Sequence, residues 1–377
     1  STERMPMLER YAEILKRAKS AKLETLTAWY SFFGMKEDPF LSQISRDEIE
    51  HFVDREDVVD AIVYDVGVAS RGIPITTLIV GPYGSGKTSI LLYVENVLQR
   101  LRQQNPDEYS FIGEFRSCTD LFQEGEGDED VQLWIKVCGK ERDYLFVDEA
   151  KPRHIGVIMR EFTRTRLKVF AISPLDLSDA YSSIPVDPKI LFLQPFNLET
   201  MKEMLQKRID RVSMNEKRTL SLLDIFEEEA LKVIHKYSMG VPLLQLKCAS
   251  KSLKLLRDLY GEKSLSDRQR KVTADIALKA CKALKCFHAF HEFKKISRVK
   301  MNVLQQILDC GKTPTEISAI LGKDRTTISR HLNELRRLGL VEFRARGRES
   351  VYKATEAARI RFEIEHMPEG RWELASA

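Results

Sequence analysis

Residues 75–101 read ITTLIVGPYGSGKTSILLYVENVLQRL, and they predict a strand, a tight loop and a helix in direct succession. The loop has the pattern G-x-x-x-x-G-K-[ST], in which glycines let backbone amides surround phosphate groups at the start of a helix. Lys87 would supply a positive charge to the β- and γ-phosphates, and the Thr88 hydroxyl would bind Mg²⁺. We therefore predict a site for ATP and Mg²⁺ that includes Gly81, Pro82, Tyr83, Gly84, Ser85, Gly86, Lys87, Thr88 and Ser89.

A second apolar run, YLFV at 144–147, ends in the carboxylates Asp148 and Glu149. In ATPases with such a loop, a carboxylate at a strand end holds the metal and another group orients the attacking water. We predict that Asp148 holds Mg²⁺ together with Thr88, and that Glu149 is catalytic together with Lys87. A strand that simply runs into an acidic loop is the alternative, and the phosphate loop upstream favours the nucleotide site.

Ser173 follows a third apolar run, residues 167–172. A polar residue at this place senses the γ-phosphate in many such ATPases, so Ser173 is a candidate catalytic residue. It can equally be a turn residue before Pro174.

The fold class follows from the alternation of patterns between residues 52 and 173. Apolar strand candidates at 75–80, 112–118, 144–147 and 167–172 alternate with helical patterns, as in βαβ units. Short, wholly apolar strands are typical of parallel sheets that are covered on both faces. We expect an α/β core with a parallel sheet, followed by an all-helical region at 197–260.

The segment from 299 to 361 predicts three helices followed by a β-hairpin. Thr313-Pro314-Thr315-Glu316 is a capping box with proline at the first helical position. This helix is expected to bury Ile317, Ile320 and Leu321. Asp324 can cap the next helix, whose uncovered face has the composition of a recognition helix in the DNA major groove: Arg325, Thr326, Ser329, Arg330, Asn333 and Arg337.

Positive charge is concentrated in this same segment. Residues 294–359 contain 15 Lys and Arg against 7 Asp and Glu, a net charge of +8, so the rest of the chain carries 4 − 8 = −4. Arg344, Arg346 and Arg348 surround a glycine turn between the two predicted strands, which suits contact with phosphates or the minor groove. We predict double-stranded DNA as the partner, and contact with protein alone is the alternative.

These motifs together resemble the AAA+ ATPases, specifically the archaeal origin-recognition initiators. FVDRE at 52–56 resembles their F-x-G-R-E box, and LFLQPF at 191–196 resembles their last strand and the start of their lid. The hairpin region resembles a winged helix-turn-helix of the MarR or ArsR type, which also ends archaeal initiators. FGMKEDPF at 33–40 resembles an edge motif of ATPases that assist transposition and secretion, and we expect its two aromatic residues to dock.

The resemblance implies five parts of the chain. They are an N-terminal helix and edge motif (1–44), an AAA+ nucleotide-binding core (45–195), a helical lid (196–262), a linker helix (263–298) and an α+β winged helix-turn-helix domain (299–377).

Two departures from the initiator pattern concern the lid and the arginine finger. The lid reads Met239-Gly240-Val241-Pro242-Leu243, without the usual arginine, and resembles the STAND signalling switches, in which the proline packs near the nucleotide base. Pro242 is therefore a candidate nucleotide contact. No arginine lies between Ser173 and Pro195, and an arginine finger is worth ~10³–10⁵ in rate. We expect slow, switch-like hydrolysis of ATP.

Composition excludes several other classes of protein. With 377 residues, 43% hydrophobic residues and only 18 Gly and 13 Pro, the chain is neither fibrous nor disordered, and its length suits two or three domains. No apolar run is long enough for a membrane helix, so we expect a cytoplasmic, chromatin- or nucleoid-associated protein with reduced cysteines.

The sequence thus favours an ATP-binding, DNA-binding protein of the origin-recognition or replication-initiator kind. Self-association or a further replication or regulatory protein as partner stays open. The alternatives are a STAND-type, ATP-regulated transcription regulator, which the lid favours, and an adaptor ATPase of a mobile element, which residues 33–40 favour.

Overall fold

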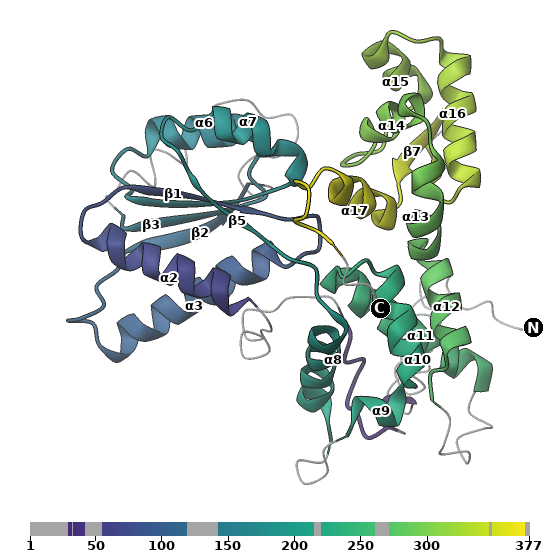
Figure 1. Cartoon of the computed structure of the whole chain (residues 1–377), viewed down its shortest axis with the longest axis horizontal. Helices are drawn as coiled ribbons and strands as arrows, with labels where there is room; N and C mark the ends of the chain where they lie inside the picture. The colour runs from purple at the N-terminus through teal and green to yellow at the C-terminus, as the bar shows by residue number, and fades with distance from the viewer. Residues whose placement is uncertain are drawn as a thin grey trace, which may run out of the picture.

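The computed structural model describes residues 29–31, 33–41, 55–118, 142–214, 220–260, 271–346 and 349–373. Figure 1 shows an α/β core, a helical region beside it, and a small domain with a hairpin, which α17 (Glu356–Glu365) joins to the core. The predicted classes of the core and of the C-terminal domain are confirmed.

The core is built on a five-stranded parallel sheet in the order β2-β3-β4-β1-β5. β1 pairs with β4 from Ile75 opposite Leu167 to Val80 opposite Ile172. β3 and β4 are buried along their whole length, in keeping with sequences that are apolar apart from Asp148 at the end of β3 and Lys168 on β4. The strands are β1 (Ile75–Val80), β2 (Gly113–Ser117), β3 (Tyr144–Asp148), β4 (Leu167–Ile172) and β5 (Lys189–Phe192). The four strands predicted from apolar runs are confirmed, β2 with slightly shorter bounds.

Helices cover both faces of this sheet (Figure 1). One face carries α2 (Glu56–Ser70) and α3 (Lys87–Gln104), and the other carries α6 (Pro152–Glu161) and α7 (Leu177–Ser182). A short 3-10 helix, η2 (Pro174–Asp176), follows β4 directly. This arrangement places the carboxyl ends of β1, β3 and β4 at one edge of the sheet, where parallel α/β folds bind ligands.

The helical region after β5 consists of α8 (Leu198–Val212), α9 (Leu222–Ile225), α10 (Glu228–Tyr237) and α11 (Pro242–Tyr260), and we call it the lid. α12 (Ala274–Ala283) packs against α10 and α11. The predicted docking of the aromatic residues near the N-terminus is confirmed: Phe40 is buried with its ring 5.8 Å from that of Phe226, and Phe33 packs against the core. The buried Asp38 carboxylate accepts a hydrogen bond of 2.6 Å from Ser250.

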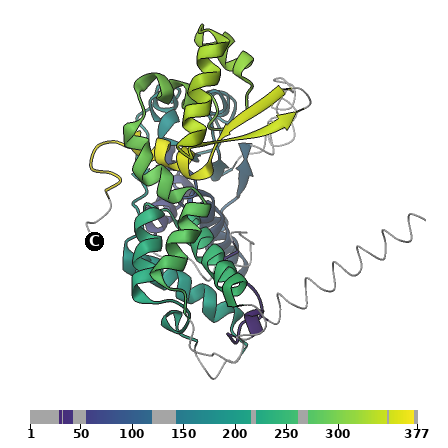
Figure 2. The same cartoon turned by 90° about the vertical axis from the view of Figure 1, so that its right-hand side faces the viewer.

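The C-terminal domain has the predicted three helices and hairpin. α13 (Cys286–Glu292) and η4 (Phe293–Lys295) lead into α14 (Arg298–Gln305), α15 (Pro314–Leu321) and α16 (Arg325–Arg337). β6 (Val341–Arg346) and β7 (Glu349–Ala354) form an antiparallel pair that projects to one side of α16 (Figure 2). α17 then follows, an element that the sequence pattern did not predict.

One core prediction in this domain is wrong. Ile317 is fully buried, but Ile320 is 53% exposed. The covered side of α15 runs along positions four residues apart: the cap residue Thr313 and Ile317 are buried and Leu321 is half-buried, so Ile320 faces away from the core.

Some predictions fall on residues that the structure leaves undescribed: the N-terminal helix up to residue 28, residues 52–54 of the FVDRE box, residues 263–270 of the linker helix, Arg348 and the side chain of Arg346. Cys118, Cys248, Cys281, Cys286 and Cys310 are free thiols. Within the described ranges no helix has the length and apolar character needed to cross a membrane.

Candidate functional site

The loop between β1 and α3 has the backbone that a phosphate site requires. Gly84 and Gly86 have φ angles of +75° and +100°, in the region that residues with side chains rarely adopt. A Cβ atom on Gly81 would lie 2.6 Å from the Ser85 hydroxyl and 3.2 Å from Leu193. Because α3 begins at Lys87, the free amides of its first turn face the loop and form an anion site.

Lys87 lies inside this loop. Its ammonium donates hydrogen bonds of 2.6 Å and 3.0 Å to the carbonyls of Gly81 and Pro82. Burial lowers the pKa of Lys87, whereas the negative charges of Glu363 and Asp148 act to raise it. The side chain is thus held at the loop, where its charge is available to an anion.

Thr88 and Asp148 meet at the carboxyl edge of the sheet, as the metal prediction requires. The Thr88 hydroxyl donates a hydrogen bond of 2.6 Å to Asp148 Oδ2. Asp148 is only 3% exposed, and burial raises its pKa. Its Oδ1 atom is buried and has no hydrogen-bond partner among the described residues. Hydroxyl and carboxylate oxygens are ligands that Mg²⁺ prefers, so this pair fits the ion.

Glu149 lies just beyond the end of β3 with an exposed side chain. Its φ angle is +53°, a strained conformation for a residue other than glycine, and such strain concentrates at functional sites. The Ser117 hydroxyl, at the end of the neighbouring β2, donates a hydrogen bond of 3.2 Å to Glu149 Oε2. The carboxylate is therefore positioned by two strand ends while it stays open to water.

Ser173 is the turn residue before Pro174, one of the two roles that the sequence allowed. Its hydroxyl accepts a hydrogen bond of 3.3 Å from the Leu175 amide and so caps η2. It also follows β4, between β1 and β3, so contact with a γ-phosphate stays a prediction.

The lid touches the phosphate loop directly at the start of α11. The Leu243 amide donates a hydrogen bond of 3.2 Å to the Gly84 carbonyl, and a Cβ atom on Gly84 would lie 2.6 Å from that of Leu243. Pro242 is half-buried at the first position of α11, after a turn in which Met239 and Gly240 have positive φ angles. An apolar side chain thus lies where initiators usually have an arginine, and the contact of Pro242 with a base stays a prediction.

Arg55 is a site residue whose role the sequence did not reveal. It is 5% exposed, and its Nη2 atom donates hydrogen bonds of 2.8 Å to the Gln194 carbonyl and 3.4 Å to the Ser85 carbonyl. Its guanidinium lies 4.6 Å from the centre of the Phe196 ring. Arg55 therefore ties the phosphate loop to the chain beyond β5. The FVDRE box was the available signal.

α17 also reaches the phosphate loop, which the sequence did not predict. Glu363 Oε2 accepts a hydrogen bond of 2.5 Å from the Tyr83 amide, and Arg359 lies 4.4 Å from the centre of the Tyr83 ring. The C-terminal domain thus contributes residues to the surroundings of the candidate nucleotide site.

The predicted nucleic-acid face lies on α16. Ile328, Leu332 and Leu335 bury one side of this helix, and the Asp324 side chain caps it by accepting a hydrogen bond of 3.1 Å from the Thr327 amide. The opposite side is exposed at Arg325, Thr326, Arg330, Asn333 and Arg337, with Ser329 half-buried.

The hairpin lies next to this helix. The Arg336 guanidinium lies 4.1 Å from the centre of the Phe343 ring, which fixes β6 against α16. Arg344 is exposed on β6. The capping box of α15 is confirmed, with Thr313 and Glu316 as its members. One helix and one hairpin thus present arginines to solvent on the same domain.

Comparison with known proteins identifies relatives of part of the chain. Residues 299–342 match the family model of the bacterial regulatory proteins of the arsR family. A search of curated protein sequences found no match.

Solved structures similar to this chain include two origin-recognition proteins, the group that the sequence resembles. The ORC2 protein of Aeropyrum pernix is 13% identical with a TM-score of 0.43, and the match covers 87% of this chain and 96% of that one. Drosophila ORC bound to DNA is 15% identical with a TM-score of 0.44, covering 90% and 91%. A RuvB variant of Thermotoga maritima is 20% identical with a TM-score of 0.41, covering 85% and 97%.

Proposed function

We propose that this chain is an ATP-binding, slowly hydrolysing AAA+ protein that binds duplex DNA through its C-terminal winged helix, in the manner of an origin-recognition initiator. The observation that carries the nucleotide part is the Thr88–Asp148 pair, in which the first turn of α3 and the end of β3 meet at 2.6 Å at the carboxyl edge of the sheet. The unpartnered Asp148 Oδ1, among the described residues, supports a metal at this pair.

Each residue of the candidate site has a separate task in this proposal. Residues Gly81–Ser89 surround the phosphates, with backbone amides as donors at every position except Pro82, and Lys87 stabilises negative charge as the terminal phosphate leaves. Thr88 and Asp148 hold Mg²⁺, which would neutralise charge on the phosphate oxygens.

Glu149, exposed and held by Ser117, orients and polarises the attacking water. Ser173 senses the γ-phosphate, and Pro242 packs near the base.

Slow hydrolysis is part of the proposal because the lid places an apolar residue against the phosphate loop. Leu243 packs on Gly84 where the initiator pattern has a lid arginine. The arginine finger is a separate matter: no arginine lies between Ser173 and Pro195, and such a finger contributes ~10³–10⁵ in rate. ATP binding would then switch the protein between two states rather than drive repeated cycles of movement.

The DNA part of the proposal depends on the exposed side of α16. Arg325 and Arg330 would pair with guanines, and Asn333 would pair with an adenine, while Thr326 and Ser329 contact bases or phosphates. Arg344, Arg346 and Arg348 of the hairpin would bind phosphates or the minor groove. The match of residues 299–342 to a regulatory-protein family supports this use of the domain.

The same match favours a second candidate function, an ATP-regulated transcription regulator of the STAND type. The apolar start of α11 against the phosphate loop also favours it, because that lid lacks the initiator arginine. Either function places the protein on chromosomal DNA.

A genome-wide map of DNA occupancy tests the proposal and separates the two functions. We expect a small number of strong sites that coincide with replication origins, and loss of these sites when Arg325 and Arg330 are both replaced by Ala. Occupancy spread over many promoters would assign the transcription role instead. An unchanged map in the double variant would contradict the DNA-reading role of α16.

A further inference from the structure

α17 places a buried carboxylate against the phosphate loop. Glu363 is 2% exposed, and its Oε2 atom accepts a hydrogen bond of 2.5 Å from the Tyr83 backbone amide. α17 also contacts η2 of the core and α13 (Figure 1). The Glu363 carboxylate of the C-terminal domain therefore occupies a backbone amide donor of the loop that is predicted to bind phosphate.

Arg359 holds this carboxylate in place. Its Nε atom lies 3.2 Å from Glu363 Oε1, and its guanidinium stacks 4.4 Å from the centre of the Tyr83 ring. Its other end forms an ion pair of 3.1 Å with Asp309. Both oxygens of Glu363 are thus engaged, one by the loop and one by Arg359. Such charge-assisted contacts with fixed geometry are among the stronger polar interactions in proteins.

The charge of Glu363 also acts on Lys87, the residue assigned to the phosphates. Burial lowers the pKa of Lys87, and Glu363 provides the largest of the opposing effects that raise it. A terminal phosphate needs the same two things, loop amides and the positive charge of Lys87. Two anions cannot share this space without strong repulsion in a buried setting.

We propose that Glu363 is a residue of the nucleotide site, supplied by the C-terminal domain, and that it competes with the terminal phosphates of ATP for the loop. This inference rests on the proposed binding of ATP. When ATP binds, Glu363 leaves the Tyr83 amide and α17 shifts, together with the winged helix to which it is joined.

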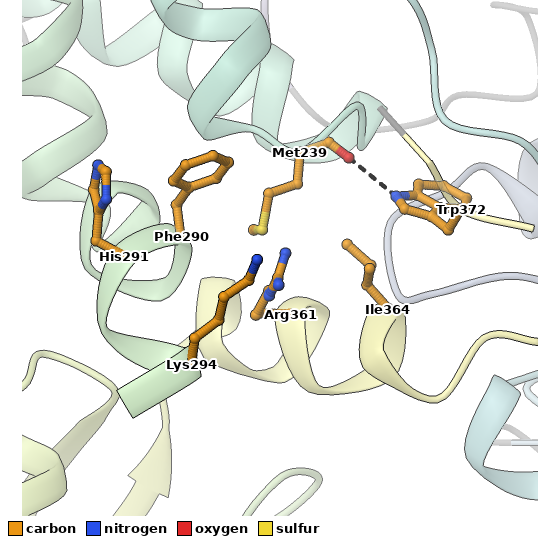
Figure 3. A pocket seen from close by; sticks show the side chains of 7 residues that line it. All are labelled: Met239, Phe290, His291, Lys294, Arg361, Ile364 and Trp372. Atoms are coloured by element: carbon orange, nitrogen blue, oxygen red, sulfur yellow. Dashed lines mark hydrogen bonds between the residues drawn. The ribbon is translucent and has the colours of Figure 1, made fainter. Parts of the chain in front are cut away.

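The packing around α17 leaves room for such a shift. A cavity of about 390 Å³ lies beside it, lined by Met239, Phe290, His291, Lys294, Arg361, Ile364 and Trp372 (Figure 3). These residues come from the lid, α13, η4, α17 and the segment after α17. This pocket is partly open to solvent, so α17 is not enclosed by packed side chains on this side, and a small displacement toward the pocket breaks fewer contacts than one into a close-packed interior.

Calorimetric titration with ATP and Mg²⁺ tests the competition, in a Glu149→Gln background that stops hydrolysis. Glu363→Gln keeps the shape of the side chain but removes its charge, and we expect it to raise ATP affinity about tenfold. The matched control is Glu365→Gln on the same helix, which pairs with Arg361 away from the loop and should leave ATP affinity unchanged. If Glu363→Gln misfolds, Glu363→Asp withdraws the carboxylate and should also tighten binding.

The outcomes separate this inference from the proposed function. Equal ATP affinities with and without the Glu363→Gln substitution would overturn the competition and leave ATP binding intact. No ATP binding with or without the substitution would overturn the proposed function itself. Amide hydrogen exchange gives a second readout: adding ATP should speed exchange in residues 356–365, and unchanged exchange there would also refute the displacement of α17.

Discussion

Lys87 and Glu149 belong to the same candidate site but face different partners, which makes their substitutions distinguishable. Lys87 lies half-buried in the phosphate loop, whereas Glu149 is exposed beyond β3. We expect Lys87→Ala to abolish ATP binding. Glu149→Gln should keep ATP affinity and lower the rate of hydrolysis by ~10²–10⁴, because we propose that this residue acts on the attacking water and not on the phosphates. Calorimetry and phosphate release measure the two effects.

The control for these variants is Glu161→Gln, which changes a carboxylate at the end of α6. It should alter neither binding nor hydrolysis. Equal loss of ATP affinity in Lys87→Ala and Glu149→Gln would remove the proposed role of Glu149.

Lys168, in the middle of the sheet, gives a prediction about pH and stability. It is 6% exposed on β4, its ammonium donates a hydrogen bond of 2.6 Å to the Thr165 carbonyl, and burial lowers its pKa to about 8. An unfolded lysine has a pKa near ~10.4, so between these values the unfolded chain binds more protons and the free energy of unfolding rises with pH. Below pH ~8 the folded protein bears the full cost of a buried charge.

We therefore expect Lys168→Met to be more stable than the wild type at pH 7, by about 1–3 kcal/mol, and to lose part of this advantage by pH ~9.5. Urea denaturation at the two pH values measures the difference. Lys279→Met on α12, where the lysine is exposed, should show no such change with pH. If the difference in the free energy of unfolding between Lys168→Met and the wild type is the same at both pH values, the titration of Lys168 is contradicted.

At the scale of elements, α16 and the hairpin should respond differently to the loss of an arginine. Arg325→Ala or Arg330→Ala should relax sequence preference and cost about 1–3 kcal/mol of binding free energy if the arginine is bidentate to a base. Arg344→Ala should weaken all sequences alike and reduce the salt slope by about 1, because a phosphate contact carries no sequence information. Fluorescence anisotropy on a cognate and a scrambled duplex, at several salt concentrations, separates the two patterns.

The control for these measurements is Lys279→Ala, which removes one positive charge from an exposed lysine of α12, outside the winged-helix domain. If the protein with intact arginines shows no salt-dependent affinity for duplex DNA, the winged helix is a protein-docking module.

Elements set by local sequence were predictable. β1 and β4 were found at their observed bounds because apolar runs between turn residues leave few alternatives, and α15 was found because a capping box marks its start. The error at Ile320 has a local cause, since spacing alone did not decide which of two faces of a short helix is buried.

Contacts between distant segments were not predictable in this way. Nothing in EAARIRFEIE at 356–365 indicates that Glu363 meets Tyr83, because the pairing depends on how the C-terminal domain sits against the core. Arg55 is a similar case, since its two carbonyl acceptors come from separate parts of the chain.

At the scale of the whole molecule, the winged-helix domain is attached both to the α/β core and to the lid. Lys247 of α11 forms an ion pair of 2.6 Å with Glu356 of α17, and the Trp372 indole donates a hydrogen bond of 3.1 Å to the Met239 carbonyl in the lid. Lys151, just after β3, lies 3.5 Å from Asp309. A change at the phosphate loop therefore has several physical routes to the orientation of α16.

The last prediction is reciprocal coupling between ATP and DNA. By linkage, the factor by which ATP changes DNA affinity must equal the factor by which DNA changes ATP affinity, and such couplings amount to about 1–3 kcal/mol, or roughly 5–150-fold. We expect different DNA affinities with ATP, with ADP and without nucleotide, measured by anisotropy in the Glu149→Gln background so that hydrolysis does not mix the states. Calorimetry of ATP with and without the duplex should return the same factor. If the three DNA affinities agree within error, ATP does not control DNA binding, and the core instead recruits another protein while the winged helix acts as a constant tether.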